Sequence, residues 1–207
     1  MATGRGTLVI ACGALAREIE ALRRANGWTG FDLTCLPPEL HNRPERIAPA
    51  VRELLEARRG EYRRIFVAYG DCGTGGRLDA LLRAEGIERL PGAHCYEFFA
   101  GSSAFAALAE EEPGTFYLTD FLTRHFERLV VRELGLDRHP ELGQEYFRNY
   151  RRVVYLSQAP SAELLERARR IAAQLGLSFE HRHTGFGELG TRLEAVAAAD
   201  RMPSWQA

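Results

Sequence analysis

The amino-acid sequence predicts an α/β protein with a Rossmann-like parallel sheet flanked by helices. The main observation is that short apolar segments alternate along the chain with segments of helical periodicity, which is the pattern of βαβ units. The second is an ordinary globular composition, with 45% hydrophobic and 27% charged residues. A chain of 207 residues has room for one or two domains. We expect a single α/β domain over residues 1–207, with two similar lobes, about 1–112 and 113–207, as the alternative.

The first half of the chain contains three expected strand–helix pairs. Each strand is a short apolar run, as in a parallel sheet that is buried on both faces. The helix after the first strand carries Leu15 and Ile19 on one face and ends near Gly27. Asn42 is expected to cap the next helix, with Pro44 in its first turn. In order, the expected elements are a strand (7–12), a helix to Gly27, a strand (31–35), a helix after Asn42, a strand (64–69) and a helix (77–84).

The second half repeats this alternation. Ser161 is a typical N-cap residue, and Gly135 is typical of a position just beyond a helix. In order, the expected elements are a strand (115–119), a helix from Asp120 to Gly135, a short helix within 139–150, a strand (152–156), a helix capped by Ser161 and a strand (177–181).

The composition excludes several classes of function. The chain has 27 basic and 28 acidic residues, a net charge of -1, which gives no electrostatic basis for binding nucleic acid. All the basic residues are arginine, so a Schiff-base, phosphate-loop or general-base lysine is impossible. No apolar run approaches the roughly 20 residues of a membrane helix, and the first one is too short for a signal peptide. We therefore expect a cytoplasmic protein without a membrane segment, whose cysteines stay reduced.

The four cysteines fall at two pairs of similar positions. Cys12 and Cys72 each precede a glycine and a helix, and Cys35 and Cys95 follow them 23 residues later. The match is compatible with an internal duplication and also with chance, because helix and strand lengths are similar in any βαβ protein. Cys12, Cys72 and Cys95 are expected near the carboxyl edge of the sheet, where α/β proteins bind ligands. Cys35 stands beside a Pro-Pro turn and is expected to pack.

A glycine-rich loop, Tyr69-Gly-Asp-Cys-Gly-Thr-Gly-Gly76, follows the third expected strand. It lacks the lysine of a phosphate loop and the spacing of a dinucleotide fingerprint, and such turns also serve merely to close a strand onto a helix. Cys72 in this loop lies near the start of a helix, which favours the thiolate. Because backbone amides and a helix start suit an anion, four residues are expected to hold an anionic part of a substrate: Gly73, Thr74, Gly75 and Gly76.

Three cysteines and one histidine make a candidate metal site. Cys12, Cys72 and Cys95 are the expected ligands, and His41 is the expected fourth ligand or catalytic base. Zinc accepts such a set tetrahedrally, and three cysteines could instead hold an iron–sulfur cluster. There is no C-x-x-C pair, so these ligands must converge through the fold. Each residue also has an ordinary alternative, as a packed thiol or a surface histidine.

Further polar residues could act as acids, bases or supporting groups. Asp120 is either such a carboxylate or a helix cap. His181 and His183 alternate onto one face of the last strand, where a solvated strand end is expected rather than a second metal site. Three residues are expected to complete the catalytic group: His94, Asp71 and Glu97.

These segments resemble the DUF1638 family, a bacterial and archaeal domain of unknown function. The family has no established activity. The resemblance implies company with corrinoid-dependent methyltransferase systems, and with it a zinc- or thiolate-centred role in methyl transfer. The matching stretches are Ala11-Cys-Gly-Ala14, Leu40-His-Asn42, Tyr69-Gly-Asp-Cys-Gly73, His94-Cys-Tyr-Glu97, Gly114-Thr-Phe-Tyr-Leu-Thr-Asp120 and Tyr155-Leu-Ser-Gln158.

Three functions follow as expectations. The first is a metal-dependent transferase that moves a group, such as methyl, to or from sulfur on a small molecule, whose anionic part the glycine-rich loop would hold. The second is a metal-free enzyme with Cys72 as nucleophile or redox thiol. The third is a non-catalytic, cofactor-binding accessory protein, with a corrinoid or methyltransferase protein as its partner. The aromatic run at 146–150 is compatible with a homodimer face and equally with core packing.

Overall fold

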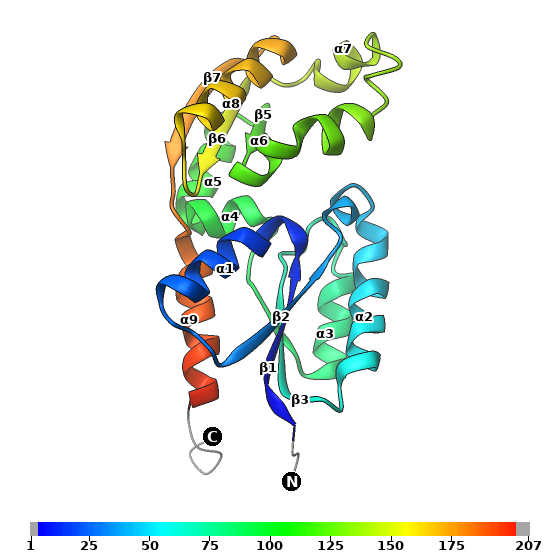
Figure 1. Cartoon of the computed structure of the whole chain (residues 1–207). Coiled ribbons are helices and arrows are strands. Elements are labelled where there is room, and N and C mark those ends of the chain that lie inside the picture. Colours follow the sequence, from blue (N-terminus) through cyan, green and yellow to red (C-terminus); the bar gives the residue numbers. More distant parts are fainter. Residues whose placement is uncertain (1–3, 202–207) are drawn as a thin grey trace. The chain divides into compact units, whose positions relative to one another are not determined.

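The computed structural model describes residues 4–201 and divides into two compact units (Figure 1). The first unit comprises the described residues of Met1–Phe98 and Glu188–Ala207, and the second is Phe99–Gly187. The second unit is therefore inserted into the chain of the first.

The first unit contains a four-stranded parallel sheet in the order β2-β1-β3-β4. Its final helix, α9, comes from the far end of the chain. The elements are β1 (Arg5–Cys12), η1 (Gly13–Leu15), α1 (Ala16–Ala25), β2 (Phe31–Leu36), η2 (Pro38–Asn42), η3 (Pro44–Arg46), α2 (Ile47–Arg58), β3 (Tyr62–Ala68), α3 (Arg77–Glu85), β4 (Glu88–Arg89), α4 (Cys95–Ala100), which crosses into the second unit, and α9 (Gly187–Arg201).

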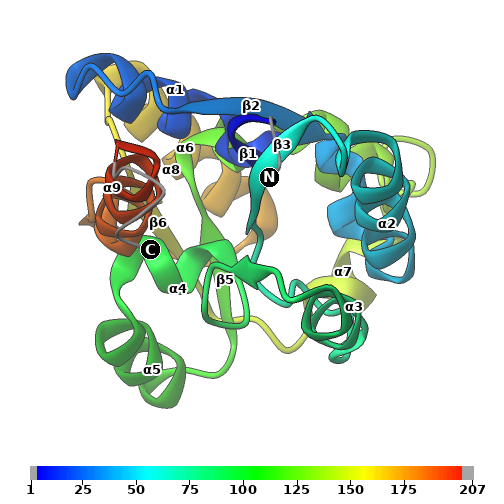
Figure 2. The same ribbon diagram turned by 90° about the horizontal axis from the view of Figure 1, so that it is seen from below.

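The strand order places helices on both faces of this sheet. The connection from β1 to β2 runs in one direction along the sheet, and those from β2 to β3 and from β3 to β4 run in the other. Right-handed crossovers then put α1 on one face, and α2 and α3 on the opposite face, as Figure 2 shows. The connections that follow β1 and β3 diverge, so the topological switch point of the sheet lies between these two strands.

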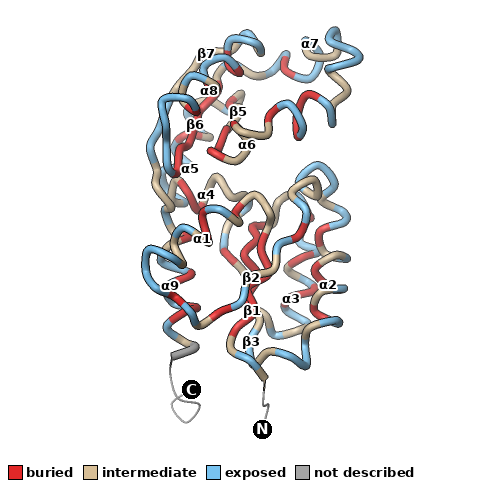
Figure 3. Tube along the Cα trace, in the orientation of Figure 1, coloured by how far each residue is buried: buried red, intermediate tan, exposed pale blue. Residues whose placement is uncertain are grey.

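Apolar residues of both strands and helices form the core of the first unit (Figure 3). The switch-point strands β1 and β3 are at its centre, and α2 and α3 pack against them. Gly190 of α9 faces Leu22 of α1, since a Cβ atom at Gly190 would lie 3.7 Å from Leu22 Cδ2. The buried residues of the core beneath α2 and α3 include Leu8, Ile10, Ile47, Val51, Leu55, Val67, Tyr69 and Leu78.

The second unit has a three-stranded parallel sheet in the order β5-β6-β7. Both connections run in the same direction, so this sheet has no internal switch point. Its elements are α5 (Ser102–Glu111), β5 (Thr115–Leu118), α6 (Asp120–Phe126), the π-helical segment η4 (Glu127–Arg132), α7 (Leu142–Phe147), β6 (Arg152–Ser157), α8 (Ala162–Leu175) and β7 (Ser178–His183).

The two faces of this second sheet are covered differently. Phe116 of β5 packs into the core formed with α6, α7 and α8, and its ring meets that of Phe126 edge-on with centroids 6.2 Å apart. Its neighbour Tyr117 points to the other face, where its ring lies 5.0 Å from that of Phe105 in α5. Period-two alternation along one short strand thus serves both layers.

The α/β fold with parallel strands is confirmed, and several local expectations are corrected. Ser161 does cap α8, since its hydroxyl accepts from the amide of Leu164 at 3.2 Å. Asn42 does not cap α2, because it is the last residue of the 3-10 turn η2, a second 3-10 turn (η3) follows it, and α2 begins only at Ile47. The helix after Asp120 is interrupted at His125, where φ is -114°, and continues as η4. Within residues 4–201, no helix combines the length and apolar character needed to cross a bilayer.

Candidate functional site

Two of the predicted cysteines flank the switch point of the first sheet. Cys12 is the last residue of β1, and Cys72 lies in the turn that follows β3. Ala11 pairs with Ala68 across these strands, so the chain positions that lead to both cysteines leave the sheet side by side. Cys12 and Cys72 also pack against the same core cluster. This edge is where open α/β sheets bind ligands.

Backbone hydrogen bonds bring the third cysteine to the same place. The amide of Asp71 donates to the carbonyl of Gly92 at 3.1 Å, and that of Cys72 donates to the carbonyl of Ala93 at 2.7 Å. Gly70 permits this close approach, because a Cβ atom there would lie 3.1 Å from the backbone nitrogen of His94. The segment then enters α4 with Cys95 as its first residue.

Cys72 has a left-handed backbone conformation, with φ at 50°, and no other non-glycine residue in the described part of the chain has positive φ. Such a conformation costs a non-glycine residue of the order of 1 kcal/mol and is concentrated at functional sites. Gly73, Gly75 and Gly76 follow with φ of 79°, 62° and 79°. The glycines therefore shape the loop around a strained cysteine.

The carboxylate of Asp71 occupies the amide-rich part of this loop. It accepts from the hydroxyl of Thr74 at 2.5 Å and from the amides of Gly76 and Gly75 at 3.0 and 3.3 Å. Partial burial works to raise the pKa of Asp71, but these hydrogen bonds outweigh it and lower the pKa below its usual value. The Asp71 carboxylate thus accepts hydrogen bonds from the same loop groups that were expected to hold an anionic part of a substrate.

The three thiols are close enough to influence one another's ionisation. Burial raises the pKa of each of them. The pKa of Cys72 reaches about 12 because the nearby Cys12 adds to the effect of burial. Both Cys72 and Cys12 in turn add to the rise at Cys95. The expected thiolate at Cys72 is therefore not favoured without a cation, partly because α3 begins only at Arg77.

Tyr69 adds a buried hydroxyl beside the thiols. The residue is 2% exposed, and its Oη atom has no hydrogen-bond partner of good geometry. Burial and the neighbouring Cys12 raise its pKa well above the usual value, and Cys72 and Cys35 contribute less. A buried hydroxyl without a partner costs about 1–3 kcal/mol. Sequence reasoning missed this residue, although it begins the glycine-rich loop.

The remaining predicted residues have separate positions in this region. His41, in η2, has an exposed side chain. The protein around it still removes part of the water from its imidazole, and this desolvation lowers its pKa, with a smaller effect from His94. The His94 ring lies 6.2 Å from that of Tyr96. The carboxylate of Glu97 accepts from the amide of Ala93 at 2.7 Å, so it holds the turn before α4. Cys35 is exposed on β2, contrary to the packed position expected for it.

All four cysteines are free thiols. Across residues 4–201, no three or more His, Cys, Asp or Glu side chains already stand in positions to hold a metal ion together. Cys12, Cys72 and Cys95 are neighbouring thiols, but their side chains would have to move closer together to bind a cation.

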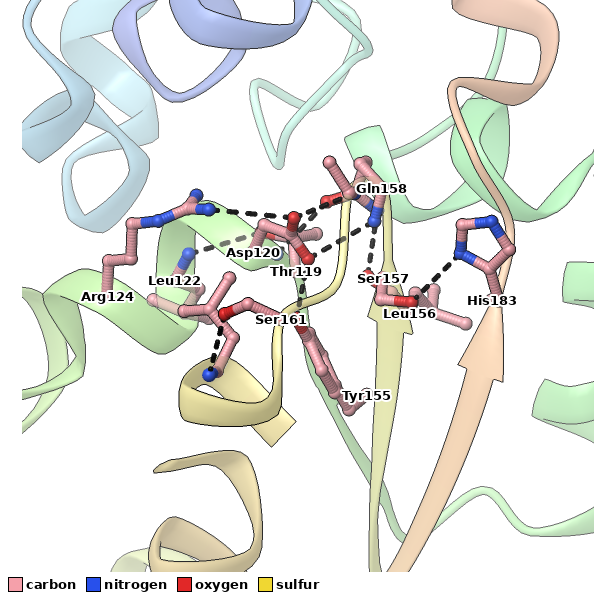
Figure 4. A network of polar contacts seen from close by, with 12 residues as sticks. Thr119, Asp120, Leu122, Arg124, Tyr155, Leu156, Ser157, Gln158, Ser161 and His183 are labelled. Atoms are coloured by element: carbon pink, nitrogen blue, oxygen red, sulfur yellow. Dashed lines mark hydrogen bonds and ion pairs between the residues drawn. The ribbon is translucent and has the colours of Figure 1, made fainter. Parts of the chain in front are cut away.

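The carboxyl edge of the second sheet carries a polar network centred on Asp120, whose partners the sequence did not predict (Figure 4). Asp120 is 1% exposed, and its Oδ1 accepts from the hydroxyl of Tyr155 at 2.6 Å and from the amide of Gln158 at 3.2 Å. Its Oδ2 accepts from the amide of Ala159 at 2.9 Å and lies 3.7 Å from the guanidinium of Arg124. Asp120 therefore fastens α6 to the loop after β6.

Gln158 completes this fastening. Its Oε1 accepts from the amide of Asp120 at 3.0 Å, and its Nε2 donates to the carbonyl of Leu156 at 2.7 Å. The helix cap itself is Thr119, whose hydroxyl accepts from the amide of Leu122 at 3.2 Å. Asp120 is thus not the cap, and its full set of partners indicates a structural role.

Ser157 lies beside this network with two histidines. Its Oγ is 2.9 Å from Nε2 of His181 and 3.2 Å from Nδ1 of His183. The His181 ring stacks on Tyr155 at 5.3 Å, and its pKa is lowered by burial and then by His183. Because Ser157 is 0% exposed, its hydroxyl orients the two imidazoles and is poorly placed to attack a substrate. The alternation of the two histidines was the available signal in the sequence.

Comparison with known proteins gives a single kind of match. A family model described as "Protein of unknown function (DUF1638)" matches residues 35–193. That range includes Cys72, Cys95 and Asp120 and begins after Cys12. No curated protein and no solved structure matches the chain.

Proposed function

The chain belongs to the DUF1638 family, and from that premise we propose that it is a metal-dependent enzyme whose Cys12, Cys72 and Cys95 bind a thiophilic cation, zinc being favoured. The observation that carries the proposal is the gathering of three thiols from separate segments at the switch point of the first sheet. An iron–sulfur cluster is the alternative occupant. The compartment that the proposal requires is a reducing one, such as the cytoplasm.

The donor set fits such a cation. Three neighbouring thiols that oppose one another's ionisation can lose their protons together only if a positive charge compensates them. His41 is the candidate fourth ligand, because the lowered pKa of its imidazole favours the neutral form that metals bind. Cys72 lies in the strained loop after β3, so its side chain is carried by the loop and not by the strand.

The chemistry follows from the chain's own groups and the metal. Cys12, Cys72 and Cys95 would hold the ion, which would supply Lewis-acid activation of a sulfur nucleophile for group transfer. His94, whose charge influences His41, is the candidate for moving a proton at this edge of the sheet. Asp71 and Glu97 support the site through the two turns that carry the cysteines.

A metal-free nucleophile is the weaker proposal. Cys72 is its candidate, and a thiol whose pKa is about 12 has only a very small thiolate fraction near pH 7. An accessory role in a methyl-transfer system, with a corrinoid or methyltransferase partner, keeps the same thiol site but has no turnover of its own.

The test is metal binding by protein purified without oxygen. Wild-type protein should contain about one zinc per chain, or take up one Co²⁺ with the intense near-ultraviolet absorption of thiolate ligands. Cys12→Ala, Cys72→Ala and Cys95→Ala should each lose the metal. Cys35→Ala is the matched control, because it also removes one cysteine but leaves the cluster intact.

Several results would separate the alternatives. Well-folded wild-type protein that binds neither zinc nor cobalt would overturn the metal proposal. Iron with acid-labile sulfide would identify the cluster instead. Equal metal content in the Cys35→Ala and Cys72→Ala variants would mean that the ion binds elsewhere.

A further inference from the structure

The ring of Tyr69 packs in the core of the first unit, and its hydroxyl lies beside the thiol cluster of Cys12, Cys72 and Cys95. The ring belongs to the buried cluster that includes Leu8, Ile10 and Val67. Its hydroxyl lies at the far end of the ring, and Cys12 packs against the same cluster as this side chain. Of the thiols, Cys12 influences the hydroxyl most. A phenylalanine would fill the same core position without burying a polar atom. The hydroxyl therefore needs a separate explanation.

The hydroxyl has no satisfactory partner as the thiols now stand. Its oxygen is buried and has no hydrogen-bond partner of good geometry. Neutral thiols are weak acceptors, so the protonated Cys12 offers the phenol little. A thiolate is a much better acceptor because hydrogen bonds to charged groups are stronger. The arrangement is thus incomplete without a charged sulfur.

We propose that Tyr69 is a positioning residue of the thiol site, whose hydroxyl donates a hydrogen bond to the sulfur of Cys12 when that sulfur is a metal-bound thiolate. This inference rests on the proposed function. The hydrogen bond fixes the direction of the Cys12 side chain and disperses charge from its sulfur. Cys72 and Cys95, on the neighbouring segments, then complete the set around the ion.

The loss of a supporting group of this kind typically weakens metal binding by about 10–100-fold. The variant to examine is Tyr69→Phe, which keeps the ring in the core. Its metal-free form should be as stable as the wild type or more stable, because a buried hydroxyl without a partner has been removed. Its Co²⁺ complex should be at least about tenfold weaker, with a shifted thiolate-to-cobalt absorption band.

The matched control is Tyr62→Phe. Tyr62 is the first residue of β3, the strand that ends just before Tyr69, and its hydroxyl donates to Asp32 at 2.9 Å near the opposite end of the sheet. This variant should keep the wild-type Co²⁺ affinity and spectrum. The measurements are anaerobic Co²⁺ titrations followed by absorption, and urea unfolding of the metal-free proteins.

The outcomes distinguish this inference from the proposed function. If wild-type protein binds Co²⁺ with thiolate absorption and Tyr69→Phe has the same affinity and spectrum, the role of Tyr69 is overturned and the metal site stands. A less stable metal-free Tyr69→Phe with unchanged Co²⁺ binding would assign the hydroxyl to the core alone. Wild-type protein that binds no Co²⁺ would overturn both.

Discussion

The backbone amide of Cys72 donates a hydrogen bond to the carbonyl of Ala93 at 2.7 Å. This contact joins two loops that are separated by α3 and β4, and it sets how far Cys95 lies from the end of β3. The relative position of two candidate ligands is thus fixed by main-chain atoms, which makes it independent of most side-chain substitutions.

The close approach at Gly70 gives a first prediction. In Gly70→Ala, the new Cβ would lie 3.1 Å from His94 N and 3.2 Å from the carbonyl of Ala93, so the 92–94 segment must shift. We expect a loss of about 1–2 kcal/mol in the free energy of unfolding, measured in urea, because overpacking against backbone is costly. Gly60→Ala, where nothing lies within 4 Å, should change stability by less than about 0.5 kcal/mol. Equal effects of the two substitutions would contradict the close approach.

The carboxylate of Asp71 gives a second prediction, which depends on pH. Since the folded-state pKa of Asp71 is lowered, its contribution is present above the unfolded pKa and is lost as the pH falls through the folded value. Asp71→Ala should destabilise the protein by about 1 kcal/mol at pH 7, a figure reduced for partial exposure. The difference from wild type should shrink in acid. Asp137→Ala, at an exposed carboxylate, is the control, and a difference that grows in acid would refute the assignment.

The thiol cluster gives a third prediction, for the metal-free protein. The folded-state pKa of Cys72 is raised to about 12, so its contribution to stability is complete below the unfolded value and is lost as the pH rises above it. Between about pH 9 and 11, wild-type protein should lose stability more steeply than Cys72→Ala, since an unfolded cysteine ionises near 8.5. Urea unfolding across this range measures the slopes. Parallel slopes for the two proteins would count against a buried, protonated Cys72.

Asp120 gives a fourth prediction, for the second unit. In Asp120→Asn, one carboxylate oxygen becomes an amide that donates, although Tyr155, Gln158 and Ala159 all donate toward this side chain. We expect a loss of about 2–3 kcal/mol in unfolding free energy. Metal binding by the first unit in the folded protein should be unchanged. Asp137→Asn serves as control, and a loss below about 0.5 kcal/mol would show that Asp120 is not a fastening group.

The sequence predicted most strands and the fold class because buried parallel strands are apolar runs that need no partner to be recognised. It did not predict α9. The buried residues of this helix, Leu189, Leu193 and Val196, stand among alanines, which occur on buried and exposed helix faces alike and so weaken the apolar periodicity. The start of α2 was misplaced because Pro44 also begins a 3-10 turn. Local pattern therefore located the sheet better than the helices at its margins.

The candidate site was predicted only in part for a similar reason. The three cysteines were predicted to be neighbours because the ends of parallel strands share an edge. The filling of the glycine loop by Asp71 depends on positive φ angles at successive residues, which a sequence of glycines permits but does not specify. The Asp120–Gln158 contact joins residues 38 positions apart, beyond the reach of any local pattern.

The insertion of the second unit has a consequence for synthesis of the protein. Residues 99–187 are contiguous, so this unit can fold as soon as it has left the ribosome. The first unit begins earlier but lacks α9, with its buried Leu189 and Leu193, until almost the whole described chain has emerged. The half that carries the cysteines is therefore expected to mature last, and a nascent chain stalled near residue 187 would hold its thiols in an unfinished fold.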